Sequence, residues 1–320
     1  MFQLYKIRNF NAIINDTFGF FKAVGKNYFR NYFIINGPLL LILIVLGYIF
    51  FKVFFEGIFS GISGSGQVSP ESAEVVESYF SDNFAMMLGL GILTGVLALI
   101  AAIISYSYPV VYLMLMEKNE KPDSKEILNA LKKKIGKAII FGLLSLVTFL
   151  PLALLLGLVS FFLIIIIIGI PVVFIFFAAF SCMIYQSFYN YISTDDGFFS
   201  SMEVGYNNLT RSFWAHAGST AIFYLILYVV QLAIMFAGTL INMLFGLVSA
   251  GPDLENPDPQ AVMQSVSIVM IVGFVIQTIV SFVMGNLIFI NQGMIYYSSK
   301  EKEDNTTLYK DIDLIGRDFE

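Results

Sequence analysis

The sequence predicts an all-α integral membrane protein, a helical bundle of about six transmembrane helices. Hydrophobic residues make up 58% of the 320-residue chain and charged residues only 13%, whereas soluble domains carry about 25% charged residues. Four stretches lack Asp, Glu, Lys and Arg altogether, at 83–116, 138–194, 212–252 and 259–299. A helix needs about 20 apolar residues to cross a bilayer. Each stretch is therefore long enough for one crossing, and the second is long enough for two.

Along the chain, these stretches and an apolar run near the N-terminus predict six spans, at 32–55, 84–116, 138–157, 160–192, 214–248 and 262–298. The chain then divides into an interfacial segment at 1–31, a transmembrane domain at 32–298 and a tail at 299–320. No cleavable signal peptide is expected, because the first long apolar run starts near Tyr32, too far from the N-terminus.

Short amphipathic helices are predicted before the first, third and fifth spans, at 16–33, 123–141 and 195–214. Each begins with an Asp that could cap the helix N-terminus, and each places apolar residues three and four positions apart. Aligning Gly25 with Gly205 superposes the first segment on the third. Such helices lie in the plane of the membrane surface. The sequence therefore predicts one unit, an interfacial helix followed by a transmembrane hairpin, used three times.

The basic residues predict the orientation. All 18 Lys and Arg residues except Lys52 fall in segments that six spans would place on one side of the membrane, and positive charge favours the cytoplasmic side. Both termini are therefore expected in the cytoplasm. Lys52 lies near the outer end of the first span, from which its side chain can reach the membrane surface. The two outer connections, 57–83 and 249–261, carry only acidic charge, whose role the sequence leaves open.

The third and fourth spans are expected to form a hairpin that turns at 157–160, either inside the bilayer or just outside it. Proline is also expected to bend several spans, because each proline removes one backbone hydrogen bond. These prolines either shape a cavity by bending the helices, or they reflect only the higher frequency of proline in membrane helices. The four prolines within predicted spans are Pro38, Pro109, Pro151 and Pro171.

Two more sets of residues are candidates for contacts inside the membrane. Small residues on one face of the second span favour close helix packing; they are Gly91, Gly95, Ala98 and Ala102. Uncharged polar residues in the last two spans either bond neighbouring helices or line a polar pocket for a ligand or a lipid headgroup. These residues are Gln231, Asn242, Gln277 and Asn286.

The composition argues against an enzyme. His216 is the single histidine and Cys182 the single cysteine, so neither a zinc site of the usual ligands nor a histidine-based triad is expected. His216 is expected to be structural at the membrane edge or, alternatively, a proton site. Ionisable residues are missing from the middles of the second to sixth spans, which argues against ion-coupled transport. No catalytic, cofactor-binding or metal-binding residue and no nucleic-acid partner is predicted.

The three units share a loose Gly-x-x-x-Phe/Leu pattern, seen at Gly25 with Phe29 and at Gly205 with Leu209, and the chain ends in the polar segment "YYSSKEKEDNTTLYKDIDLIG" at 296–316. In these features the chain resembles a broad group of bacterial multi-pass proteins. The group includes the membrane domain attached to some glycerophosphodiester phosphodiesterases and many uncharacterised inner-membrane proteins. The resemblance implies a membrane module in the bacterial inner membrane. It carries over no catalytic residue, because the phosphodiesterase chemistry belongs to a separate soluble domain.

Two functions follow as alternatives. The first is a non-enzymatic scaffold or complex subunit that binds a protein partner through its basic cytoplasmic helices, where the lysines at 132–134 would also attract anionic lipids. The second is a protein that binds or transports lipids or hydrophobic small molecules without ion coupling. Tight small-residue contacts would favour the first function, and an apolar cavity the second. The sequence points to no particular ligand, partner or oligomeric state.

Overall fold

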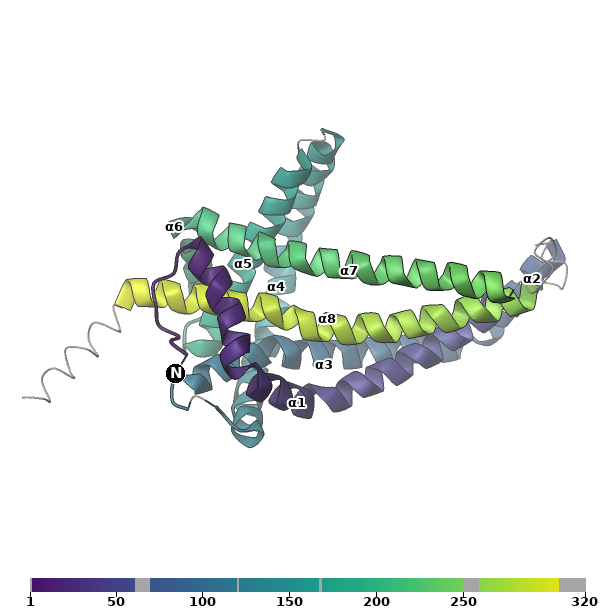
Figure 1. Ribbon diagram of the computed structural model, residues 1–320, viewed down its shortest axis with the longest axis horizontal. Coiled ribbons are helices and arrows are strands. Elements are labelled where there is room, and N and C mark those ends of the chain that lie inside the picture. The colour runs from purple at the N-terminus through teal and green to yellow at the C-terminus, as the bar shows by residue number, and fades with distance from the viewer. Residues whose placement is uncertain (1, 61–69, 120, 167–168, 250–258, 305–320) are drawn as a thin grey trace, which may run out of the picture. The chain divides into compact units, whose positions relative to one another are not determined.

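The computed structural model describes residues 2–60, 70–119, 121–166, 169–249 and 259–304, and within these ranges the chain is all-α (Figure 1). The helices alternate with short connections along the chain. They are α1 (Phe10–Ser60), α2 (Pro70–Asp82), α3 (Phe84–Met116), α4 (Ser124–Ile165), α5 (Gly169–Ser193), α6 (Phe198–Arg211), α7 (Phe213–Ser249) and α8 (Pro259–Asp304).

Six of these helices, α1, α3, α4, α5, α7 and α8, are long and apolar enough to cross a membrane. The predicted all-α class and the six predicted spans are thereby confirmed at the level of length and hydropathy. Several helices are much longer than one crossing. The 51 residues of α1 extend about 77 Å at 1.5 Å per residue, against about 30 Å of hydrocarbon. Such helices must continue beyond the apolar layer.

The extra length comes from the predicted surface helices, two of which are continuous with the following span. The segment predicted at 16–33 lies inside α1, and the segment predicted at 123–141 forms the first part of α4. Even the Gly37-Pro38 pair, which follows the surface segment of α1, does not end that helix. The third surface helix differs, because α6 ends at Arg211 and α7 starts anew at Phe213. Of the three units, one therefore has a separate surface helix in the described structure.

The predicted N-caps are correct in one case of three. Asp123 precedes α4, and its backbone N–H donates to the Glu126 carboxylate at 3.0 Å, one half of a capping box. The prediction that Asp16 caps the first helix was wrong, because α1 starts at Phe10 and Asn9 caps it by accepting the Ala12 N–H at 2.9 Å. In the third segment, predicted to start at Asp195, the N-cap is Gly197.

The predicted turn at 157–160 was wrong. Helix α4 continues through these residues to Ile165, and Ile166 takes an extended conformation at its end. A single glycine costs a helix only about 1 kcal/mol, so Gly157 does not end α4. The helix instead ends within the isoleucine run, where β-branched side chains lower helix propensity. Residues 167–168 lie outside the described part of the chain.

Three of the four prolines lie inside helices: Pro38 in α1, Pro109 in α3 and Pro151 in α4. The bend predicted at Pro171 was wrong, because this residue lies in the first turn of α5, which starts at Gly169. The first four N–H groups of a helix have no intrahelical acceptor. Proline therefore removes no hydrogen bond at this position.

The chain forms two compact units. The first unit comprises residues 1–36, 103–227 and 284–320, and the second comprises 37–102 and 228–283. In the second unit many large apolar side chains stay exposed. Leu41, Leu99 and Phe236 each expose about two thirds of their surface (64%, 66% and 65%). Exposing apolar surface to water costs roughly 25 cal/mol per Å², so this part of the protein surface suits a lipid environment.

Buried tyrosines from α1 and α3 form much of the core of the first unit. The Tyr28 ring packs edge to face on Tyr108 and Tyr112, with centroids 5.1 and 4.9 Å apart. Both partner hydroxyls donate to α1: Tyr108 to the Tyr28 carbonyl at 2.7 Å, and Tyr112 to the Asn27 side-chain oxygen at 2.8 Å. The phenol rings thus fill the core while their hydroxyls are hydrogen-bonded, as buried tyrosine requires.

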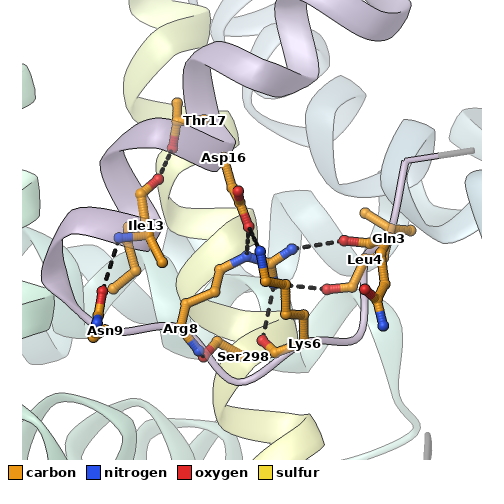
Figure 2. A network of polar contacts seen from close by, with 10 residues as sticks. Gln3, Leu4, Lys6, Arg8, Asn9, Ile13, Asp16, Thr17 and Ser298 are labelled. Atoms are coloured by element: carbon orange, nitrogen blue, oxygen red, sulfur yellow. Dashed lines mark hydrogen bonds and ion pairs between the residues drawn. The ribbon is translucent and has the colours of Figure 1, made fainter.

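The N-terminal segment is tied to α8 through a buried arginine (Figure 2). The Arg8 guanidinium donates to Asp16 of α1 at 2.8 Å and to the carbonyl oxygens of Leu4 and Gln3 at 2.7 Å each. The Arg8 backbone N–H donates to the Ser298 hydroxyl of α8 at 2.8 Å. Arginine supplies five donors in a fixed geometry, so one side chain holds the segment before α1 in place.

Candidate functional site

Three of the four predicted pocket residues line one groove of the second unit, between α7 and α8. Gln231 and Asn242 come from α7 and Gln277 from α8. The groove has a volume of about 520 Å³, within the 300–1,000 Å³ typical of small-molecule sites. Its other lining residues are Tyr228, Leu232, Ile234, Met235, Gly238, Thr239, Val269, Met270 and Gly273.

Helix periodicity explains why these residues share a groove. On α7, Gln231, Gly238 and Asn242 are separated by seven and four residues, and on α8, Gly273 and Gln277 by four. Residues with this spacing lie on the same helix face. The α7 face from Tyr228 to Asn242 extends about 21 Å at 1.5 Å per residue. The groove can therefore hold an elongated molecule.

Two glycines keep the groove open. A Cβ atom added at Gly238 or Gly273 would meet no atom within 4 Å. Sequence reasoning missed both residues. The signal was available, because each groove-lining amide at 242 and 277 has a glycine four residues earlier.

The polar groups of the groove differ in their hydrogen bonding. The Gln277 amide donates to Ser281 on its own helix at 3.3 Å, and the Thr239 hydroxyl donates to the Met235 carbonyl at 2.9 Å. The Asn242 side-chain oxygen is buried and accepts no hydrogen bond from the described residues. A buried acceptor without a donor costs about 1–3 kcal/mol. The Asn242 oxygen is therefore an unused acceptor in the groove wall, and a small turn of the side chain would present it to a donor from outside the chain.

Asn286, the fourth predicted pocket residue, lies in the first unit and not in the groove. It is fully buried, and its side-chain oxygen accepts the Tyr28 hydroxyl at 2.5 Å. The contact joins α8 to α1. Of the two interpretations of the polar residues, Asn286 thus follows the first, bonding between neighbouring helices.

A second buried polar network joins four helices of the first unit. Gln186 of α5 donates to the Gln292 carbonyl of α8 at 2.9 Å, and Gln292 donates to the Thr220 hydroxyl of α7 at 2.7 Å. Asn208 of α6 donates to Gln186 at 3.4 Å. All four side chains are at most 2% exposed. Such a network fixes how its helices pack, because moving one helix away would leave buried polar groups without hydrogen-bond partners.

Three of the four predicted packing residues of α3, Gly91, Gly95 and Ala98, show no close helix contact in the described structure. A Cβ atom at Gly91 or Gly95 would meet no atom within 4 Å, and Ala98 is exposed while Ala102 is half-buried. The strip thus faces away from the rest of the second unit. The three prolines inside helices, Pro38, Pro109 and Pro151, do not line the groove.

Within the described residues, no three His, Cys, Asp or Glu side chains come together as metal ligands would. The fold and the six apolar helices define an integral multi-pass membrane protein of the all-α class. Comparison with protein-family models, with curated proteins and with solved structures finds no match to this chain.

Proposed function

We propose that this chain is a non-enzymatic protein of the bacterial inner membrane, with both termini in the cytoplasm, that binds a lipid or another hydrophobic small molecule in the α7–α8 groove. The observation that carries the proposal is the pairing of an apolar groove with the unpartnered Asn242 oxygen. Apolar walls with a few polar groups are typical of small-molecule sites. The groove therefore suits an elongated apolar ligand that bears a hydroxyl or N–H group.

The position of the groove supports this ligand class. Its residues belong to the apolar stretches of α7 and α8, and several, including Leu232, Met235 and Met270, are exposed. A ligand could therefore enter directly from the hydrocarbon layer. The donor of the ligand would satisfy Asn242 where water is scarce, and an unsatisfied polar group in lipid is costly.

Filling the groove tests the proposal. Gly273→Phe places a ring where no atom lies within 4 Å of the added Cβ, so it should occupy the groove and leave the helices in place. We expect lipid retained through purification in mild detergent, measured by native mass spectrometry, to fall at least about tenfold, the effect of losing about 1.4 kcal/mol of binding energy. Gly238→Phe should act in the same way.

The matched control is Gly91→Phe. Gly91 is also a helix glycine of the second unit with no atom within 4 Å, but it does not line the groove. Lipid retention should be the same in this variant as in the unmodified protein. Equal retention in Gly273→Phe and Gly91→Phe would contradict the proposed site.

A membrane-embedded protein partner is the second candidate, and the open strip at Gly91, Gly95 and Ala98 is the observation that favours it. Small residues let a second helix approach closely. A scaffold of this kind should lose a stoichiometric partner in Gly91→Phe and keep it in Gly273→Phe. The same two variants thus separate the two functions. Ligand binding in the groove predicts a defect in Gly273→Phe, whereas partner binding predicts a defect in Gly91→Phe.

A further inference from the structure

A small pocket in the first unit lies where α6 meets α7, beside the N-terminal segment and the last turns of α8. Its volume is about 40 Å³, about three times the 10–15 Å³ that holds one water. The polar residues that surround it are Arg8, Arg211, Ser212, His216, Ser298, Ser299 and Lys302. All belong to the first unit, so this pocket is formed independently of the groove.

The pocket has an excess of positive charge. Arg8 is paired with Asp16 at 2.8 Å, and Arg211 is paired with Glu303. Lys302 is exposed and forms no ion pair with a described residue. The two arginines are thus balanced by carboxylates and the lysine is not. An anion would gain from this uncompensated charge.

His216 provides a second observation that points to a ligand. Its side chain is 5% exposed and borders the pocket. Its Nδ1 lies 2.6 Å from the Asn208 carbonyl oxygen, so Nδ1 carries a proton and donates it there. The other ring nitrogen, Nε2, has no hydrogen-bond partner among the described residues. In this neutral tautomer Nε2 can accept from the P–OH group of a phosphate monoester, and the Ser299 hydroxyl, whose residue is 7% exposed and borders the same pocket, can donate to the phosphate oxygens.

Helix α7 adds further donors. Its first intrahelical bond runs from the His216 N–H to the Ser212 carbonyl at 3.0 Å. The N–H groups of residues 213–215 therefore have no acceptor within the helix. The N-terminus of a 37-residue helix also carries a partial positive charge. Together with Lys302 and the Ser299 hydroxyl, it forms a set of donors of the kind that binds phosphate.

We infer that this pocket binds a phosphate group, held by Lys302, His216 and the first turn of α7. The group could belong to a phospholipid headgroup or to a water-soluble phosphate. Trp214, next to the pocket in sequence, is 72% exposed, and tryptophan is enriched at membrane–water interfaces. This position at headgroup depth favours the lipid source.

Trp214 is also the single tryptophan of the chain, so its fluorescence reports on this site. The full-length protein would be titrated with inorganic phosphate in detergent. It would then be reconstituted into nanodiscs of phosphatidylcholine with increasing phosphatidic acid. We expect a saturable emission change with phosphatidic acid. Saturation by inorganic phosphate at similar concentrations would assign the site to soluble phosphates. No saturable change with either probe would overturn the inference.

Two variants at exposed positions make the result specific. Lys302→Gln should weaken binding about tenfold, the effect of one charge-assisted hydrogen bond, and Arg211→Gln should weaken it further by leaving Glu303 unpaired. The control, Lys133→Gln, removes an exposed positive charge from α4, outside the pocket. Equal affinities for Lys302→Gln and Lys133→Gln would show that only general surface charge attracts the anion and would contradict a site in this pocket.

Discussion

Gly205→Ala should lower the free energy of unfolding by about 1–3 kcal/mol, the cost of overpacking a well-filled core. A Cβ atom at Gly205 would lie 2.6 Å from the Met183 carbonyl oxygen and 2.9 Å from the Ser187 backbone nitrogen, and would also overlap the Ser187 hydroxyl. The first two atoms belong to the backbone of α5 and cannot turn away. Helices α5 and α6 would have to move apart, and the buried Asn208–Gln186 contact lies between the same two helices.

The matched control is Gly25→Ala, at the position that sequence alignment of the repeated units pairs with Gly205. There the added Cβ would lie 3.5 Å from the nearest atom, the Phe21 Cβ, an ordinary van der Waals contact. Alanine is also the better helix former by about 1 kcal/mol, so this variant should be neutral or slightly stabilised. Thermal unfolding in detergent, followed by Trp214 fluorescence, compares the two. Equal midpoints would contradict the close approach of α5 and α6.

Arg8→Ala should cost about 1–3 kcal/mol, the range for leaving buried hydrogen-bond acceptors without a donor. The Arg8 side chain is fully buried, and its loss would leave the carbonyl oxygens of Gln3 and Leu4 without their donor and Asp16 with Lys6 as its remaining partner. Burial lowers the pKa of the Arg8 guanidinium, and the Asp16 carboxylate opposes this shift. The guanidinium stays charged at neutral pH, because its ordinary pKa lies above 12.

Lys6→Ala is the control for this prediction, because Lys6 contacts the same Asp16 oxygen at 3.1 Å but is 44% exposed. Exposed ion pairs contribute about 0–1 kcal/mol. The stability of each variant and the protease sensitivity of its N-terminal segment would be measured together. If Lys6→Ala and Arg8→Ala were equally stable, the buried network of Figure 2 would not hold this segment on α8.

The sequence predicted the helices of this protein better than their ends. Long charge-free stretches can only be helices in lipid, so the six apolar helices follow from composition and spacing. Their ends depend on weaker signals. Gly157 suggested a turn, yet the helix continues past it to Ile165. Asp16 suggested a cap, yet the helix already begins at Phe10, where Asn9 supplies the capping oxygen.

The candidate site was predictable in part. The amides Gln231, Asn242 and Gln277 were found because polar groups are rare in apolar spans, and the structure places them along one groove. Asn286 could not be separated from them by sequence, because its partner Tyr28 is 258 positions away in the chain. The same holds for the Gln186–Gln292 contact between α5 and α8. Such contacts depend on how distant helices pack, which no local pattern records.

The proposed ligand site requires that α7 and α8 cross the membrane, and the threading of the whole chain can be measured by cysteine labelling. The single native cysteine, Cys182, is buried, so single cysteines can be introduced at the exposed positions Glu74, Lys133 and Glu203. An impermeant maleimide applied to intact cells should label the first from outside and the other two only after permeabilisation. Labelling of positions 74 and 133 from the same side would contradict a crossing by α3, and with it the six-span topology on which the ligand site depends.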